Sequence, residues 1–176
     1  MIGMQVLNIH ERRIPRPAAE VGRLIDTLAS EGDRLWPRAL WPAMRFDRAL
    51  GVGAEGGHGP IGYAVGEYRP GNYVRFRFTA PGGFTGGHWF DVHAEGDAAC
   101  VLRHTISMDA RGSGLLLWTL AIRALHDALI EDAFATAEAA LGLTPQVRPW
   151  TPWVRLLRRL IAGRRARPQM FGAMAR

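Results

Sequence analysis

Residues 113–141, SGLLLWTLAIRALHDALIEDAFATAEAAL, decide the fold of this chain. The segment contains no proline, and its one glycine lies in the first turn, so the pattern predicts a single long helix. At about 1.5 Å per residue that helix is about 40 Å long, enough to cross a small domain. Ser113 is a candidate N-cap, and Gly142 follows the last apolar position as a stop signal.

The predicted helix has a polar and an apolar face, with one exception. At about 100° per residue, the polar arc holds Arg123, Asp127, Glu131 and Glu138, and the opposite face holds Leu117, Trp118, Ala121, Ile122, Leu125, Ala128 and Leu129. Asp132 projects from the apolar face, where an unpaired carboxylate costs on the order of several kcal/mol. It is therefore hydrogen-bonded by Thr136 or backbone groups, exposed where the helix frays, or directed at a polar spot in a cavity.

The composition is that of a globular protein. Of 176 residues, 48 % are hydrophobic and 22 % are charged. The one cysteine, Cys100, cannot form an internal disulfide, and MIGMQVLNIHERR does not resemble a signal peptide, so we expect a cytoplasmic location. The most apolar run, residues 115–130, is interrupted by charged residues and is not expected to span a membrane.

Charge divides the chain into two parts. Residues 1–142 hold 14 arginines and 16 acidic residues, a net charge of −2, whereas residues 143–176 hold eight arginines and no acidic residue, a net charge of +8. We therefore expect a domain over residues 1–142 and a basic C-terminal segment, rich in proline and arginine, over residues 143–176. A nearly neutral domain argues against nucleic acid as a partner.

The N-terminal part predicts one strand and two short helices. Residues 5–14 are typical of a strand, and residues 18–29 of a short helix. The sequence LWP then occurs twice, with Trp36 and Trp41, and two prolines five residues apart exclude a regular helix there. We interpret this stretch as a broken helix or loop that packs its tryptophans on the core or covers a pocket.

Residues 44–109 alternate as the strands of an antiparallel sheet do. The clearest case is YVRFRFT at residues 73–79, where apolar and arginine side chains alternate. The glycine-rich residues 51–60 lack phosphate-binding spacing and do not open a helix, so a nucleotide site is rejected. The expected strands are residues 45–50, 61–68, 73–79, 87–94 and 98–108.

The last two of these strands place two histidines together. If residues 95–97 form a three-residue hairpin loop, Ala94 pairs with Ala98 and His88 lies directly opposite His104. Both histidines share the parity of the apolar face, so their side chains point at whatever covers the sheet. The long helix is the natural cover.

The basic C-terminal segment holds a short amphipathic stretch, residues 153–162, after three prolines. One side of this stretch is apolar and the other is rich in arginine. Such a stretch can lie on an anionic membrane surface or bind an acidic partner. Alternatively, the segment folds back on the domain. The residues that would make the contact are Trp153, Arg155, Arg158 and Arg159.

The predicted order of elements resembles the helix-grip fold of the START-like, polyketide cyclase/dehydrase (SRPBCC) superfamily. GGHGPIGYAVGEYRPGNYVRFRF, GGHWFDV, LRHTI and LHDALIEDAF are similar to uncharacterised bacterial members, and the resemblance covers residues 4–142. It implies an α+β fold in which a curved antiparallel sheet grips the long helix around a cavity. Members of the superfamily bind lipids, hormones or polyketides, and some are cyclases or aromatases. No catalytic motif of the superfamily can be transferred to this chain.

We therefore expect a small hydrophobic or aromatic ligand, such as a lipid or a polyketide-like molecule, in a cavity between the sheet and the long helix. Apolar pockets with few polar groups are typical of such ligands. The predicted lining is Tyr63, Phe76, Phe78, His88, Phe90, His104, Ile122, Leu125, Leu129 and Asp132.

The alternative is a cyclase- or dehydratase-type enzyme in which His88, His104 and Asp132 serve as general acid and base. The same three residues also match the ligand types of a metal triad, although we expect neither a metal nor a cofactor. His93 has outward parity on its strand, and His126 neighbours the polar arc of the helix and is expected to be solvated or at its boundary.

Overall fold

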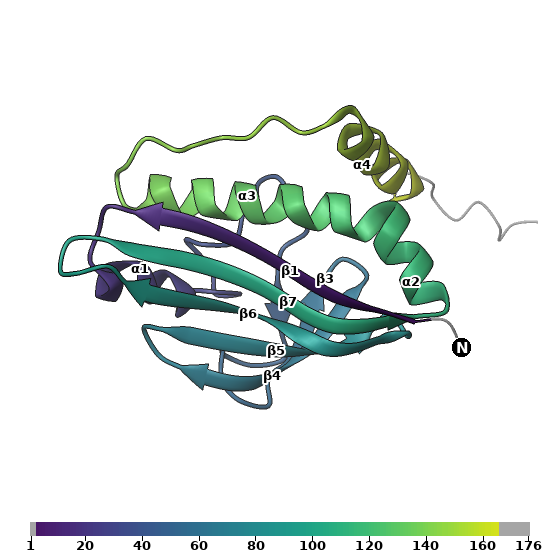
Figure 1. The fold of residues 1–176 in the computed structure, drawn as a ribbon, viewed down its shortest axis with the longest axis horizontal. Helices are drawn as coiled ribbons and strands as arrows, with labels where there is room; N and C mark the ends of the chain where they lie inside the picture. Colours follow the sequence, from purple (N-terminus) through teal and green to yellow (C-terminus); the bar gives the residue numbers. More distant parts are fainter. Residues whose placement is uncertain (1–2, 166–176) are drawn as a thin grey trace, which may run out of the picture.

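Seven antiparallel strands form one curved sheet in residues 3–165, the part of the chain that this computed structural model describes (Figure 1). The strands are β1 (Gly3–Ile14), β2 (Arg45–Phe46), β3 (Glu55–His58), β4 (Ile61–Arg69), β5 (Tyr73–Ala80), β6 (Phe84–Ala94) and β7 (Cys100–Arg111). Their order is β1-β7-β6-β5-β4-β3-β2, so only the pairing of β1 with β7 joins strands distant in sequence. The predicted antiparallel sheet is confirmed.

The long helical segment lies along one face of the sheet (Figure 1). It consists of α2 (Ser113–Leu117), the π-helical turn η1 (Trp118–Ile122) and α3 (Arg123–Ala140). Its predicted end is confirmed, because Gly142 has a φ of 71° and the Leu143 N–H donates to the Glu138 carbonyl at 2.9 Å. Its predicted N-cap is wrong, because Gly112 takes that position and no side chain makes a capping hydrogen bond there.

The sheet and the helical segment together make the helix-grip arrangement that the sequence predicts. The largest side chains that are fully buried between them are Tyr63, Phe76, Phe90 and Phe134. By length and composition alone, Ser113–Ala140 is also apolar enough to cross a membrane, with a mean hydropathy of 1.3 over 18 residues. Only 22 % of that window is buried, so much of this apolar segment lies at the surface of the domain.

The register of β6 and β7 differs from the prediction by two residues. Ala94 pairs with Cys100, and His88 pairs with Ile106. The hairpin loop is longer than expected because the Glu95 N–H donates to the Ala99 carbonyl at 2.8 Å, which closes a five-residue connection. A shift of two preserves parity, so His88 and His104 still point to the same face, as diagonal neighbours rather than a direct pair.

Several short elements also differ from the prediction. The helix α1 (Ala18–Ile25) ends four residues early, and residues 30–44 form turns instead of a second helix, although Trp36 and Trp41 are buried as expected. The strand expected at residues 45–50 is reduced to β2. β3 lies in the glycine-rich stretch, where a Cβ on Gly56 would come within 1.9 Å of the Arg45 carbonyl oxygen. Close approach of the backbones therefore explains this glycine.

The C-terminal helix α4 (Pro152–Arg165) folds back over the helical segment (Figure 1). Val154 is 2 % exposed and belongs to the main core, and the Trp153 indole N–H donates to the Leu120 carbonyl at 3.0 Å. The predicted short amphipathic helix is therefore present and joined to the domain. Residues 166–176 of the predicted basic segment lie outside the described residues.

Candidate ligand-binding site

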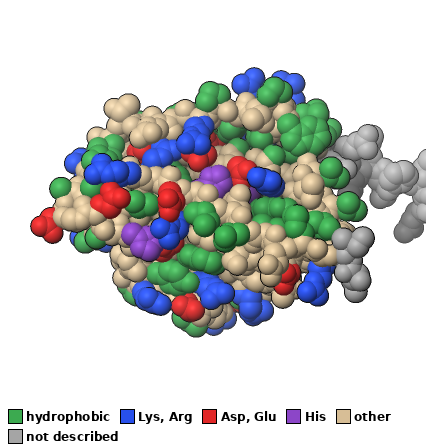
Figure 2. Space-filling model, viewed as in Figure 1, with side chains coloured by type: hydrophobic (Ala, Val, Ile, Leu, Met, Phe, Trp, Pro, Cys, Tyr) green, Lys and Arg blue, Asp and Glu red, His purple; other side chains and the backbone are tan. Residues whose placement is uncertain are grey.

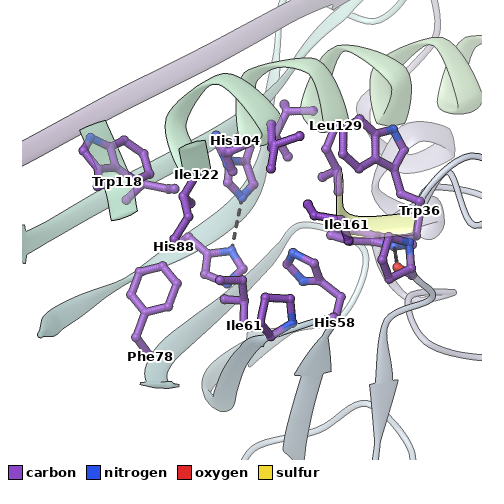
Figure 3. Close-up of a pocket in the computed structure, with 18 of the residues that line it drawn as sticks. Trp36, His58, Ile61, Phe78, His88, His104, Trp118, Ile122, Leu129 and Ile161 are labelled. Carbon is purple, nitrogen blue, oxygen red and sulfur yellow. Dashed lines mark hydrogen bonds between the residues drawn. The ribbon is translucent and has the colours of Figure 1, made fainter. Parts of the chain in front are cut away.

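A cavity of about 480 Å³ lies between the sheet, the helical segment and α4 (Figure 3). Its wall is formed mainly by apolar and aromatic side chains. They include Trp36, Leu40, Ile61, Phe78, Phe84, Ile106, Met108, Trp118, Ile122, Leu125, Leu129 and Ile161.

Four histidines supply most of the polar groups in this wall (Figure 3). His88 on β6 and His104 on β7 are hydrogen-bonded to each other, with 3.2 Å between Nδ1 of His88 and Nε2 of His104. The ring of His126, from α3, lies 4.9 Å from that of His104. His58, from β3, lies across the cavity, and its Nδ1 is 3.0 Å from the hydroxyl of Tyr63.

Burial keeps all four imidazoles neutral at physiological pH. It lowers the pKa of His58 to about 3, and it lowers the pKa of His88 and of His104 well below the usual range. Burial also lowers the pKa of His126, although the carboxylate of Asp127, 3.6 Å from its Nδ1, acts in the opposite direction. The four histidines therefore make the cavity polar without adding charge, and the charged side chain among its described wall residues is Arg158.

The hydrogen-bonded pair of His88 and His104 presents one donor and one acceptor. A neutral imidazole carries one N–H and one lone pair, so whichever ring donates within the pair, one N–H and one lone pair are left over. These remaining atoms are Nε2 of His88 and Nδ1 of His104, and neither has a hydrogen-bond partner within residues 3–165. Both nitrogens of His126 are likewise unpartnered there. Such buried unpartnered atoms are uncommon in proteins.

A charged network lies on the other side of α3, against β1. Asn8, His10 and Arg12 share one face of the strand, and they meet Asp127, Glu131 and Glu138 of the helix in the same order. Two strand residues span about 6.7 Å and the four helical residues from Asp127 to Glu131 about 6 Å, so this part of the two rows stays aligned. Glu138 lies seven residues beyond Glu131, and Arg12 bridges the two carboxylates. The contacts are Asn8 Nδ2–Asp127 Oδ1 at 3.0 Å, His10 Nε2–Asp127 Oδ1 at 3.0 Å, His10 Nδ1–Glu131 Oε1 at 3.2 Å, Arg12 NH2–Glu131 Oε2 at 2.8 Å and Arg12 NH1–Glu138 Oε2 at 2.9 Å.

His10 in this network has a raised pKa. Its burial opposes the charged form, but hydrogen bonds to Asp127 and Glu131 outweigh that effect. His10, His126 and Asp127 also bring three potential metal-ligand atoms within 4.8 Å of one another. In the present geometry both nitrogens of His10 contact carboxylates, which suits an imidazolium. The predicted triad of His88, His104 and Asp132 is not assembled.

Asp132 holds two tryptophans rather than a ligand. Its Oδ2 accepts hydrogen bonds from the indole N–H of Trp41 at 2.7 Å and of Trp150 at 2.8 Å. The guanidinium of Arg158 lies over both rings, 4.3 Å from the centroid of Trp41 and 4.0 Å from that of Trp150. The carboxylate of Asp132 is therefore hydrogen-bonded, as one of the sequence interpretations allows, but its partners are indoles; the Thr136 hydroxyl donates instead to the Asp132 backbone carbonyl at 2.8 Å. The predicted convergence of Asp132 with the two histidines is wrong.

The structure brings six of the ten predicted site residues to the cavity: Phe78, His88, His104, Ile122, Leu125 and Leu129. Tyr63, Phe76 and Phe90 are fully buried behind the histidines, with the rings of Tyr63 and Phe76 at 4.9 and 4.8 Å from that of His88. His93 is exposed, as its outward parity predicts, and Cys100 is a buried core residue.

The sequence analysis missed Trp36, His58, Trp118 and His126 as members of one site. The sequence predicts that Trp36 packs on the core or covers a pocket. Trp36 does both, because it is 2 % exposed and lines the cavity. His126 lies at the boundary of the polar arc, with 13 % of its side chain exposed, and it also lines the cavity. Its place in the site was missed because the polar arc that it borders packs against β1.

No protein-family sequence model matches this chain, and no curated protein matches it either. Solved structures do match in fold. A point mutant of norcoclaurine synthase from Thalictrum flavum, in complex with a transition-state analogue, is 14 % identical, with a TM-score of 0.61 over 81 % of this chain and 98 % of that one. A Thermobifida fusca protein is 14 % identical, with a TM-score of 0.60 over 81 % and 99 %. A conserved Enterococcus faecalis protein of unknown function is 12 % identical, with a TM-score of 0.54 over 91 % and 84 %. The helix-grip fold is thereby established.

Proposed function

We propose that this protein binds a small, mainly apolar molecule with an aromatic ring system and at least one hydroxyl or carbonyl group. The observation that carries the proposal is the cavity of about 480 Å³ with unpartnered imidazole nitrogens in its wall residues. Ligand pockets have volumes of about 300–1,000 Å³ and combine apolar walls with a few polar groups that orient the ligand. This cavity has both properties.

The state of the histidines limits the chemistry of the ligand. Neutral imidazoles give no charge to pair with a carboxylate or phosphate, and the guanidinium of Arg158, which also lines the cavity, lies over the rings of Trp41 and Trp150. Recognition of the ligand by the histidines therefore rests on hydrogen bonds and on contacts with aromatic rings. The pair of His88 and His104 can donate one hydrogen bond and accept another after a small side-chain adjustment, which suits a phenol, an enol or a ketone.

A structural neighbour supports aromatic ligands for this fold. Norcoclaurine synthase from Thalictrum flavum has also been solved in complex with dopamine and hydroxybenzaldehyde. That structure is 13 % identical to this chain, with a TM-score of 0.57. The likeness supports the shape of the site and leaves the ligand of this chain to be identified.

Two probes that differ by one hydroxyl test this proposal. We expect the protein to bind 2-naphthol about fivefold more tightly than naphthalene, because one net hydrogen bond contributes on the order of 1 kcal/mol. Calorimetric titration gives both affinities. The change Ile122→Trp should abolish binding of both probes by filling the cavity, while Leu116→Trp, on the exposed side of the same helical segment, should leave binding intact. Absence of binding by the wild-type protein would refute the proposal.

The hydrogen bond between His88 and His104 favours a second candidate, an enzyme that moves protons. A neutral imidazole can take a proton from a carbon next to a carbonyl, and the second imidazole of the pair can position it. Asp132 cannot orient this pair, since its carboxylate is held by Trp41 and Trp150. In this candidate enzyme, His88 and His104 would therefore act as general acid and base without Asp132.

Deuterium exchange into 2-tetralone tests the enzyme. Proton abstraction at the carbon beside its carbonyl is followed by NMR in D₂O, with free imidazole at the same concentration as the reference. We expect the exchange to be faster with the protein and to lose that acceleration in His88→Phe and in His104→Leu. Exchange that continues in both variants would sink the enzyme proposal without affecting ligand binding.

A further inference from the structure

We propose that one end of the molecule docks on an anionic lipid surface and so places the cavity beside the membrane. The docking surface consists of exposed apolar side chains of α2, η1 and α4. Docking itself does not depend on the proposed function. The passage of a ligand between the membrane and the cavity does rest on it. The side chains of this surface are Leu116, Leu117, Leu120, Trp153, Leu156 and Leu160.

The first argument is the extent of apolar exposure. Leu116 is 63 % exposed, Leu120 is 61 % exposed and Leu160 is 56 % exposed, in a helical segment whose composition would suit a membrane. Single exposed leucines are common, but a contiguous group marks an interaction site. The second part of the segment, α3, is fixed in the domain by the network with β1, so only the first part is free to meet lipid.

The two elements that carry the surface are fastened to each other. Trp153 of α4 donates its indole N–H to the Leu120 carbonyl of η1, and Val154 next to it is buried in the core. On α4, Trp153, Leu156 and Leu160 fall at helical spacing, so they make one stripe on its outer side. The apolar side chains of α4 and η1 therefore form one surface rather than two separate ones.

Charge identifies the occupant as an anionic membrane. Residues 113–122 and 152–161 contain no acidic residue, and α4 presents the exposed Arg155 and Arg159 beside its apolar stripe. Figure 2 shows arginine side chains next to hydrophobic ones over α4. Apolar side chains flanked by arginines are the pattern of helices that lie in a lipid interface. Arg158 contributes less, since it is held against Trp41 and Trp150.

The surface is continuous with the cavity. Leu40 and Ile161 line the cavity and are also 49 % and 43 % exposed, so they form part of its rim. Trp118 and Ile122 line the cavity from η1, whose outward residues belong to the docking surface. An apolar ligand could therefore pass between the bilayer and the cavity without crossing water.

Vesicle flotation with the full chain tests docking. Vesicles of phosphatidylcholine alone are compared with vesicles that contain three parts of phosphatidylglycerol in ten. We expect flotation with the anionic vesicles only, weakened at least tenfold in the double variant Leu116→Glu with Leu120→Glu. The matched control is Leu7→Glu with Ile9→Glu, because these β1 side chains are 69 % and 51 % exposed and lie outside the docking surface.

Three results would overturn the proposal: no flotation of the wild-type protein, an equal loss in the β1 control, or no loss in the Leu116 and Leu120 variant. A loss confined to Arg155→Gln with Arg159→Gln would indicate a purely electrostatic contact, as with an acidic protein, and would also overturn it. Binding of 2-naphthol should persist in the Leu116 and Leu120 variant, because neither residue lines the cavity. Failure of docking and failure of ligand binding are thus separate results.

Discussion

The two sides of α3 hold histidines in opposite electrostatic settings. On the β1 side, hydrogen bonds to Asp127 and Glu131 overcome burial and raise the pKa of His10. On the cavity side, burial lowers the pKa of His104 and of His126, although His126 and Asp127 are adjacent in sequence. The difference lies in which side of the helix the carboxylates face.

This separation suits a site that binds apolar molecules. Asp127, Glu131 and Glu138 of α3 are paired with β1, and Figure 2 shows charged side chains between these elements. His58, His88 and His104 therefore have no carboxylate beside them, and an imidazole without a counter-charge in an apolar surrounding stays neutral. At His126 burial outweighs the neighbouring carboxylate of Asp127. The charged network holds the helix in place, and the neutral cluster is left with hydrogen-bonding capacity for a ligand.

The largest expected effect on the free energy of unfolding comes from removing Arg12, the buried arginine of the network. Arg12→Met leaves Glu138 buried, and Glu131 loses its closest partner, so we expect the free energy of unfolding to fall by about 3–5 kcal/mol. Urea denaturation measures the loss. The matched control is Arg13→Met on the same strand, whose pair with Glu95 is exposed and should matter by less than about 1 kcal/mol. Equal effects in the two variants would contradict the buried network.

Asp132 belongs neither to the charged network nor to the histidine cluster. Its removal should have the next largest effect on the free energy of unfolding. Asp132→Leu leaves the indole N–H groups of Trp41 and Trp150 without an acceptor, so we expect a loss of about 2 kcal/mol in urea denaturation. Tryptophan emission should shift as the two rings lose their fixed positions. Asp132→Asn, which keeps an accepting oxygen, should lose less; a larger loss in this variant would contradict the assigned role.

The fold was predictable from the sequence because its signals are local and strong. Alternation at Val74, Phe76 and Phe78 requires a sheet with one buried face, and the uninterrupted residues 113–141 require one helical cover. The hairpin register was not predictable, because a three-residue and a five-residue loop leave the same residues facing inward. Only the hydrogen bond between Glu95 and Ala99 distinguishes the two.

The candidate site was predictable in part, for reasons that can be traced to particular residues. His88 and His104 follow from strand parity alone, so they were found despite the wrong register. His126 was not recognised as a cavity residue because the polar arc that it borders packs against β1 instead of facing solvent. The partners of Asp132 were missed because Trp41 and Trp150 lie 91 and 18 residues away, in stretches without regular structure that no periodic pattern can orient.

The pH dependence of the free energy of unfolding should be set mainly by the four cavity histidines, which outnumber His10. The four cavity histidines have lowered folded-state pKa values, so the unfolded chain takes up protons first and stability falls as pH drops below about 6.5. His10 has the opposite sign, since its contribution is complete below about 6.5 and is lost as pH rises through its raised pKa.

Because four histidines oppose one, we expect the free energy of unfolding to decrease from pH 7 to pH 5, by at most about 1.4 kcal/mol per pH unit for each cavity histidine. The pKa of Asp127 is lowered, so its own contribution is lost only at more acidic pH. Urea denaturation at pH 5, 6 and 7 gives the slope. His104→Leu should flatten it and His10→Asn should steepen it; the reverse pattern would show that the charge states are assigned wrongly.

The smallest effect on stability, and the most informative for function, is expected from the double change His88→Leu with His104→Leu at pH 7. The change removes both partners of the buried hydrogen bond together with the two nitrogens that have no partner, so unfolding should change by less than about 1 kcal/mol. Binding should change more. The preference for 2-naphthol over naphthalene should fall from about fivefold to about equal affinity, because the pair no longer offers a donor or an acceptor. If the preference persists in this variant, the hydroxyl is recognised elsewhere in the cavity, with His58 as the next group to change.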